Sequence, residues 1–394
     1  MKQFKKGIAL LMALTIFSIL LQPSFPVIAA KPAEASPTSQ LTILVRSSQT
    51  ALMFSKLEIS NPKITKAILN AKKEATNEAS LFTDIEVSFM HGQQLSHYRM
   101  EKSGELWDEA ASQSLIVPPA ITESLLKYTE ALRKSHYGKL TKWEDARRLV
   151  ARKSIFSITD LETGLSFKVQ RRAGSSHADV QPITKEDSKI MSQIYGGHWS
   201  WKRKAILVQS GGKRIAASMN GMPHGGDGIP DNGFSGHFCV HFLDSTSHRS
   251  TAPDPAHQLM VYKATGNLRP YLDSASPMLL AESFIEAMNQ QDVEMLQQIA
   301  NGMTKERLSY FVTELGSLSS IRIHLPKKLK QINPSGWNES LTTDLNLPIK
   351  VHKNSQPDRN THYRFIFKRE SNKSPWNIDD LETKGATNHS SLIP

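Results

Sequence analysis

The chain has 394 residues and one cysteine, Cys239, so no disulfide within the chain can hold its fold together. The fold must therefore depend on buried apolar side chains and hydrogen-bonded backbone. Cys239 lies in the stretch Asn220–Val261, which also contains five of the fourteen histidines and several glycines. A core segment does not concentrate imidazoles and glycines in this way. This composition indicates a functional site.

The first 30 residues have the pattern of an export signal. Three lysines among the first six residues form a basic start, Ile8–Leu21 is apolar, and Val27–Ala30 offers small residues for cleavage. The apolar run is short for a membrane span, which favours a cleaved signal over an anchor. Residues 31–40 are rich in proline, alanine and serine and are expected to be a disordered tether. The chain is thus predicted to be secreted or cell-wall associated, and peripheral to a membrane at most.

The chain is basic, with a formal net charge of +11 and a pI near 9.5. On a secreted protein this charge favours attraction to peptidoglycan or another anionic wall polymer, or to lipid headgroups. The sequence lacks the interleaving of arginines and aromatic residues that is typical of RNA-binding surfaces, so we expect no nucleic-acid partner. The simpler alternative is that the charge only keeps the protein soluble.

The pattern of elements predicts an α+β multidomain protein, with a central mostly-β domain flanked by small α+β modules. Residues 41–145 combine β-rich segments with apolar residues at helical spacing from Ile121 to Leu132. A hairpin is expected at Ser103–Gly104. We interpret this region as a small α+β domain, and nothing in it suggests catalysis.

Residues 146–266 are predicted to form the mostly-β domain that carries the candidate site. Alternating apolar and polar residues indicate hairpins at Thr163–Gly164 and at Gly211–Gly212. Thr184 and Asp187 have the spacing of a capping box at the start of a helix. The second hairpin leads into the histidine-rich stretch, and active sites often lie on loops that rigid strands hold in place.

Residues 267–276 are expected to be a linker, and residues 383–394 a disordered tail. Between them, residues 277–382 begin with apolar residues at helical spacing, such as Leu280 and Phe284, and end with strand-like segments. Helices followed by a meander of strands are similar to the α+β cone domains of the nuclear transport factor superfamily. This resemblance implies a pocket or a dimer face rather than catalysis.

Cys239 is the candidate nucleophile of the histidine-rich stretch. A thiol attacks a carbonyl efficiently as a thiolate, so it needs a base or a positive charge nearby. In a strand, His237 and His241 would share the face of Cys239, because alternate residues point to the same side. His224 lies upstream on a loop, and folding would have to bring it close. Asn220 or a backbone carbonyl is the candidate group for orienting His224.

The segments Pro223–Gly225 and Ser235–His241 resemble the signature of the L,D-transpeptidase (YkuD-like) catalytic domain, within roughly residues 154–266. That family has a His-Gly pair, a spacer, and then Ser/Thr-His-Gly-Cys followed by an apolar residue and Arg or Asn. The resemblance implies that Cys239 is the acylated nucleophile, His224 the base and His237 the histidine two residues before the cysteine. The supporting positions are Asn220, Gly225, Ser235, Gly236 and His241.

The chain departs from this signature at three positions. Phe238 replaces the glycine between the histidine and the cysteine, Gly236 separates Ser235 from His237, and His241 replaces Arg or Asn. These differences affect the expected oxyanion-binding geometry and the substrate. The implied reaction needs no cofactor: the thiolate attacks the amide after the diamino acid of a peptidoglycan stem and expels D-alanine. An amine of a neighbouring stem, or water, then resolves the thioester.

A zinc-dependent wall hydrolase is the first alternative. Imidazoles are common zinc ligands, and four of them lie close together in the sequence. This alternative assigns the metal to His237, His241, His248 and His257.

A non-catalytic wall-binding or scaffolding protein is the second alternative. In such a protein the histidines only hydrogen-bond a glycine-rich loop. His177 and Asp179 are similar to ligand pairs of wall metallopeptidases, but their turn-like surroundings favour a structural turn.

Overall fold

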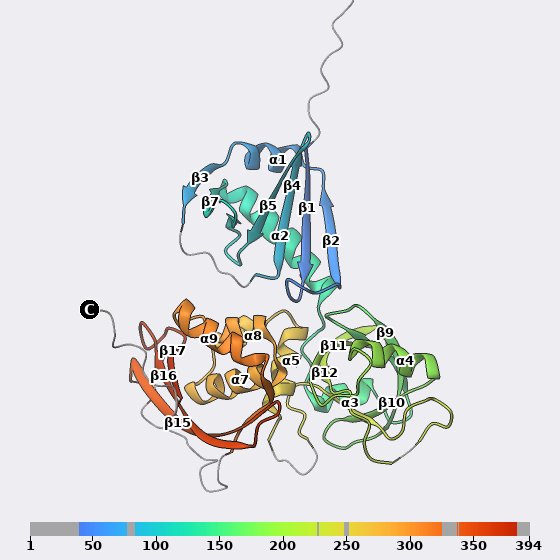
Figure 1. Cartoon of the computed structure of the whole chain (residues 1–394). Coiled ribbons are helices and arrows are strands. Elements are labelled where there is room, and N and C mark those ends of the chain that lie inside the picture. Colours follow the sequence, from blue (N-terminus) through green and yellow to red (C-terminus); the bar gives the residue numbers. More distant parts are fainter. Residues whose placement is uncertain are drawn as a thin grey trace, which may run out of the picture. The chain divides into compact units, whose positions relative to one another are not determined.

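A computed structural model describes residues 39–76, 83–226, 228–247, 252–324, 337 and 339–383. In this part of the chain both helices and strands are present, and the strands form three sheets (Figure 1). The predicted α+β class is confirmed at this level. The predicted signal and most of the predicted tether and tail lie outside the described residues.

The first sheet comes from the N-terminal part of the described chain. Its elements are β1 (Ser39–Arg46), β2 (Phe54–Ile59), α1 (Pro62–Leu69), β3 (Lys72–Ala75), β4 (Ile85–His91), β5 (Gln94–Met100), β6 (Leu106–Asp108), β7 (Gln113–Ile116) and α2 (Pro119–His136). The strand order is β2-β1-β4-β5-β6-β7-β3, and α2 packs against β1 and β2 (Figure 1). The predicted helix is confirmed as α2, and the hairpin at Ser103–Gly104 joins β5 to β6.

The second sheet is a closed six-stranded barrel. Its region contains α3 (Trp143–Leu149), β8 (Ile155–Asp160), β9 (Ser166–Ala173), β10 (Ala178–Pro182), α4 (Lys185–Ile194), β11 (Lys204–Ser210), β12 (Lys213–Met219) and β13 (Phe238–His241). The order around the barrel is β10-β13-β12-β11-β8-β9, and β9 pairs back to β10. Both predicted hairpins are confirmed, as β8–β9 and β11–β12. Thr184 and Asp187 form the expected capping box of α4.

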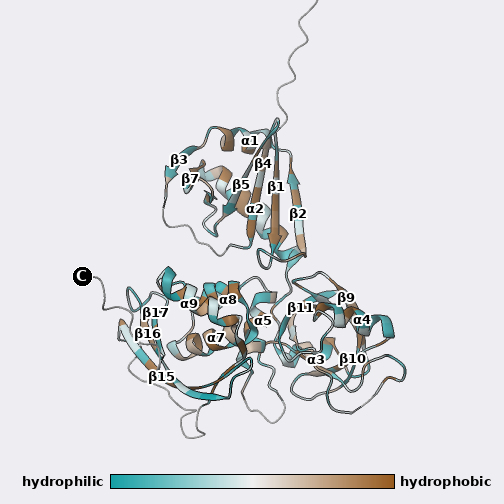
Figure 2. Ribbon diagram, in the orientation of Figure 1, coloured by the Kyte–Doolittle hydropathy of each residue, from teal (hydrophilic) through white to brown (hydrophobic). Residues whose placement is uncertain are grey.

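The third sheet follows a group of helices. Its region contains α7 (Pro277–Gln290), α8 (Val293–Ile299), α9 (Lys305–Leu315), β14 (Leu318–Ile323), β15 (Thr342–Lys353), β16 (Arg359–Lys368) and β17 (Asn377–Thr383). The strands form an antiparallel meander in chain order, and α7 packs against it. Figure 2 shows α7 as largely hydrophobic, and its Phe284 ring contacts the rings of Phe311 and Phe365.

Two helices connect the barrel to this third region. They are α5 (Pro255–Ala264) and α6 (Leu268–Asp273). Helix α5 packs against β11, β12 and α7. Residues 267–276, predicted as a linker, contain α6 and bury Leu268 and Leu272, so this segment contributes to the core. From Ser39 onward the described residues belong to one compact unit. Among these residues, no helix has the length and apolar character needed to cross a membrane.

Candidate active site

Strand β13 determines which side chains meet at Cys239. Phe238 and Val240 are fully buried in the barrel core, and the Phe238 ring contacts the Phe167 ring. Cys239 and His241 therefore point to the opposite face, as the alternation of a strand requires. In the antiparallel pairing with β10, Asp179 lies directly opposite Cys239. The bulky Phe238 at the family's glycine position thus has a packing role in the barrel.

The thiol of Cys239 contacts the imidazole of His224. Sγ lies 3.2 Å from Nε2, and His224 Nδ1 lies 2.8 Å from the Met222 carbonyl oxygen. A carbonyl oxygen can only accept, so Nδ1 carries the ring proton. The Nε2 lone pair then faces the thiol. This geometry is that of a nucleophile and a base that a third group orients.

A backbone pairing brings His224 to Cys239. His224 N donates to His237 O at 2.9 Å, and His237 N donates to His224 O at 2.7 Å. Two glycines with positive φ permit this approach: Gly225 at +72° and Gly236 at +89°. A Cβ on Gly236 would lie 2.4 Å from His224 O, and one on Gly225 would lie 2.2 Å from the His237 ring. The glycines that the resemblance selected therefore bring the two segments into register.

Asp179 joins the cysteine to two more histidines. Its Oδ1 lies 2.9 Å from His177 Nε2, 3.7 Å from His237 Nε2 and 3.9 Å from Cys239 Sγ. Asp179 is buried and belongs to strand β10, so the expectation of a structural turn at this residue is wrong. The chain reverses between β9 and β10, before Asp179. The pairing of β10 with β13 determines where the Asp179 carboxylate points.

Of the two groups expected to orient His224, Asn220 or a backbone carbonyl, the structure shows the backbone carbonyl. The Met222 carbonyl, rather than Asn220, orients His224. Asn220 is buried, and its side chain hydrogen-bonds the Cys239 sulfur, which lowers the pKa of the thiol. Ser235 is exposed at the surface. Asn220 is therefore placed to donate to charge that develops on sulfur.

Burial makes Cys239 a weak acid. The residue is 4% exposed. Burial, and then the Asp179 charge, raise the pKa of the thiol to about 12. At neutral pH the resting thiol is therefore protonated.

The three histidines of the zinc alternative that the structure describes, His237, His241 and His257, do not form a metal-binding cluster. His241 stacks on His257 with 3.7 Å between ring centroids, His237 contacts Asp179, and His248 lies outside the described residues. His257 Nδ1 lies 2.9 Å from Ser218 Oγ. Burial lowers the pKa of both His241 and His257 well below the usual value, so both rings are neutral.

A different set has ligand atoms close enough together to consider a metal: His177, Cys239 and His241, within 4.8 Å of one another. Both nitrogens of His177 already have partners. Nε2 contacts Asp179 at 2.9 Å, and Nδ1 lies 2.8 Å from the Thr246 carbonyl oxygen. These two contacts occupy the atoms with which the His177 ring would bind a metal. The set therefore fits a hydrogen-bond network better than a metal centre.

Trp201 is a neighbour of the site that sequence reasoning missed. Its ring centroid lies 5.1 Å from that of His224, and the residue is 51% exposed. Its segment, residues 199–203, is distant from Cys239 in the sequence, and the fold brings Trp201 next to His224. No motif in the sequence marks this tryptophan as a neighbour of His224.

Two comparisons with known proteins found no relative of this chain. No family model matches the chain, and no curated protein matches it.

Proposed function

We propose that this chain is an exported, wall-associated cysteine acyltransferase, related to the L,D-transpeptidases, that acts on peptidoglycan stem peptides. The observation that carries the proposal is the 3.2 Å contact between Cys239 Sγ and a His224 ring whose Nδ1 is held by the Met222 carbonyl. A buried cysteine that only packs needs neither the base nor its orienting group.

The first half-reaction transfers an acyl group to sulfur. His224 Nε2 takes the thiol proton as Sγ attacks the substrate carbonyl carbon. The S–C bond forms, and the carbonyl π electrons move to oxygen. When the tetrahedral intermediate collapses, the C–N bond breaks and His224 returns the proton to the leaving amine. D-alanine leaves, and a thioester remains on Cys239.

The second half-reaction reverses the proton's path. An amine of a neighbouring stem, or water, gives a proton to His224 Nε2 as it attacks the thioester. The C–S bond then breaks, and the sulfur recovers a proton from His224. Burial, and then the Asp179 carboxylate 3.9 Å from the sulfur, raise the pKa of Cys239 and so keep the resting thiol protonated.

We also propose a division of the chain into modules and a partner in the cell wall. Each sheet uses strands from one of the predicted regions, 41–145, 146–266 and 277–382, apart from a few residues at their edges. We therefore propose three modules, of which the third is related to nuclear transport factor-like domains. The positive charge supports anionic wall polymer as the partner.

The test is an exchange assay with the purified full chain. A stem tetrapeptide ending in D-alanine is mixed with a D-amino acid acceptor, and released D-alanine and the exchanged peptide are followed by mass spectrometry. We expect turnover in the wild type, and losses of more than about a thousandfold in Cys239→Ala and His224→Ala. Full turnover in Cys239→Ala would refute the thiol mechanism, and turnover lost on adding a chelator would favour the zinc alternative.

A further inference from the structure

A cavity of about 680 Å³ adjoins the His224 side of the site. Met222, whose carbonyl orients His224, lines it, as does Trp201, whose ring lies beside the His224 ring. Its other walls come from α7 and β14, which belong to the third region. The lining residues from these two elements and the segment between them are Glu286, Asn289, Gln290, Ser319, Ser320 and Arg322.

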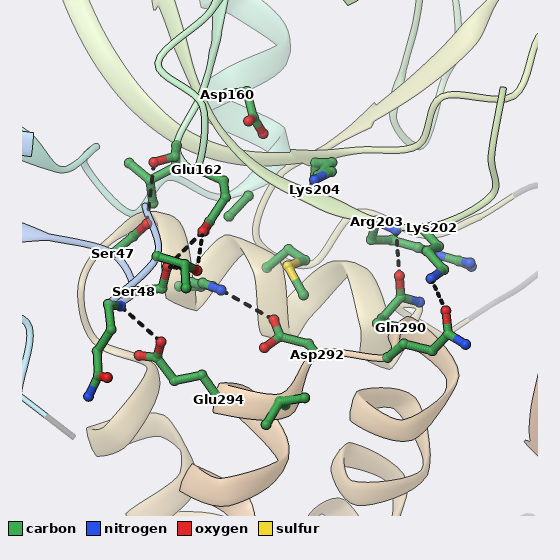
Figure 3. Close-up of a pocket in the computed structure, with 18 of the residues that line it drawn as sticks. Ser47, Ser48, Asp160, Glu162, Lys202, Arg203, Lys204, Gln290, Asp292 and Glu294 are labelled. Atoms are coloured by element: carbon green, nitrogen blue, oxygen red, sulfur yellow. Dashed lines mark hydrogen bonds and ion pairs between the residues drawn. The ribbon is translucent and has the colours of Figure 1, made fainter. Parts of the chain in front are cut away.

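Packing contacts and hydrogen bonds join the walls of this cavity. Helix α5 packs against β11, β12 and α7, so it bridges the barrel and the third region. The Arg203 backbone N–H donates to Gln290 Oε1 at 2.7 Å, and Lys202 Nζ donates to Gln291 Oε1 (Figure 3). These bonds connect the segment that carries Trp201 to the end of α7.

Two groups in the cavity have polar atoms without a protein partner. Gln290 is 8% exposed, and its Nε2 has no hydrogen-bond partner among the described residues. The bond from Arg203 fixes the orientation of its amide, so Nε2 cannot exchange places with Oε1. Arg322 is exposed, and its guanidinium makes no hydrogen bond or ion pair with the described residues. Both groups are donors.

The cavity in Figure 3, of about 520 Å³, shares Lys202, Arg203 and Gln290 with this one but differs in chemistry. There the charges are paired internally. Glu162 accepts from Ser48, Glu294 accepts from the Gln49 N–H, and Lys263 pairs with Asp292 (Figure 3). Of these two donors, Arg322 lines only the cavity next to His224, whereas Gln290 lines both cavities and its Nε2 is buried.

We propose that this groove is a substrate subsite in which α7 and β14 bind a carboxylate-bearing peptide whose scissile bond lies at Cys239. Arg322 binds the carboxylate through its planar fork, and Trp201 packs on the peptide next to His224. The peptide assignment rests on the proposed function. The carboxylate assignment rests on Arg322 and Lys202, two cationic side chains of the lining against one acid, Glu286. Arg203 is not counted, because its guanidinium is already paired with Asp254 at 2.7 Å.

The experiment measures binding without turnover, in full-length protein carrying Cys239→Ala. The probe is the stem tetrapeptide with a free glutamyl α-carboxylate, and the reference is the same peptide with that carboxylate amidated. Calorimetry gives the affinity, and fluorescence of the exposed Trp201 gives a second readout. We expect amidation and Arg322→Met each to weaken binding about tenfold or more, and the two together to cost little beyond either alone.

Arg148→Met is the matched control. Arg148 is an exposed arginine on α3, outside the groove, and its replacement should leave the affinity unchanged. Trp201→Ala should weaken binding of both peptides alike. Wild-type affinity in Arg322→Met, equal affinity for the two peptides, or no binding at millimolar peptide would each overturn the proposal. If Cys239 proves to be inactive while binding still depends on Arg322, the proposed function fails and the groove remains.

Discussion

At the scale of single residues, the site combines the buried Cys239 thiol with the His224 ring, whose Nε2 faces the sulfur. The two features act in opposite directions. Burial and Asp179 raise the pKa of Cys239 to about 12, which suppresses the thiolate. The His224 contact at 3.2 Å provides the proton acceptor at the moment of attack. The thiol is therefore expected to be unreactive toward reagents that need a preformed thiolate.

Alkylation by iodoacetamide tests this expectation. At pH 8, a pKa of about 12 in place of the usual 9.0 lowers the thiolate fraction about a thousandfold. The folded protein should react at least about a hundredfold more slowly than the chain in urea, and Asp179→Asn should react faster than the wild type. Intact-mass kinetics give both rates. Equal rates for folded and unfolded chains would show that the thiol is neither buried nor suppressed.

The same shift has a consequence for stability in alkali. The folded pKa of Cys239 is above the usual 9.0, so the folded state holds its proton after the unfolded chain has lost it. The stability from this group is fully present below pH 9 and is lost as the pH rises toward 12. Cys239→Ala should therefore lose less stability between pH 9 and pH 11 than the wild type, as measured by urea unfolding. Parallel losses in the two proteins would contradict the assignment.

At the scale of elements, two glycine-bearing segments bring the base to the nucleophile. Gly236 has φ of +89°, and a Cβ there would lie 2.4 Å from His224 O. Gly236→Ala should therefore destabilise the fold by about 2 kcal/mol and abolish acyl transfer, because it separates His224 from Cys239. Gly196 is the matched control, with φ of +67° and open space around its Cβ position. Gly196→Ala should lose about 1 kcal/mol and keep full turnover.

The stacked histidines make the contact between β13 and α5 sensitive to acid. His241 and His257 have pKa values well below 6.5 because burial, and then neighbouring positive groups, oppose their charged forms. Their stability contribution is present above pH 6.5 and is lost as the pH falls. Each should contribute a slope of about 1.4 kcal/mol per pH unit below pH 6.5. Urea unfolding from pH 7 to pH 5 measures this slope. His257→Phe should reduce the slope by about 1.4 kcal/mol per pH unit, which corresponds to one proton. An unchanged slope would contradict the account.

Local patterns predicted the elements better than the contacts between them. Hairpins at Gly164 and Gly211 and the Thr184 capping box follow from turn and capping chemistry, which is local. The shared face of Cys239 and His241 follows from strand alternation. The Asp179 contact could not be predicted, because it depends on the register of β10 against β13. The sequence pattern does not indicate strand β15 or helix α9. The proline and serine residues around α6 favour a linker, but the structure has a helix there.

At the scale of the whole molecule, helix α5 connects the barrel to the third region, and an ion pair secures the helices on that side. Lys263 Nζ lies 3.2 Å from Asp292 Oδ2, and both side chains are largely buried. Asp292 also caps α8 by accepting from Met295 N at 2.9 Å. Because the Lys263 charge lowers the pKa of Asp292, removing the lysine leaves an uncompensated carboxylate in a buried position.

A variant cycle tests this connection. Lys263→Met should destabilise the chain by about 2 kcal/mol, less than for a fully buried pair because some solvent reaches both groups. Asp292→Asn keeps an N-cap and removes the charge, so adding it to Lys263→Met should recover much of the loss. Thermal or urea unfolding measures all four proteins. A double variant as unstable as the sum of the singles would show that the two charges are not coupled.

The most direct test of the central claim is the mass of the protein after incubation with a carbapenem, which acylates nucleophilic cysteines of the proposed family. The account predicts a single adduct, located on Cys239 by peptide mapping. It should be absent in Cys239→Ala and formed at least about a hundredfold more slowly in His224→Ala. An adduct that forms at the wild-type rate without His224, or a folded wild-type protein that gains no mass, would contradict it.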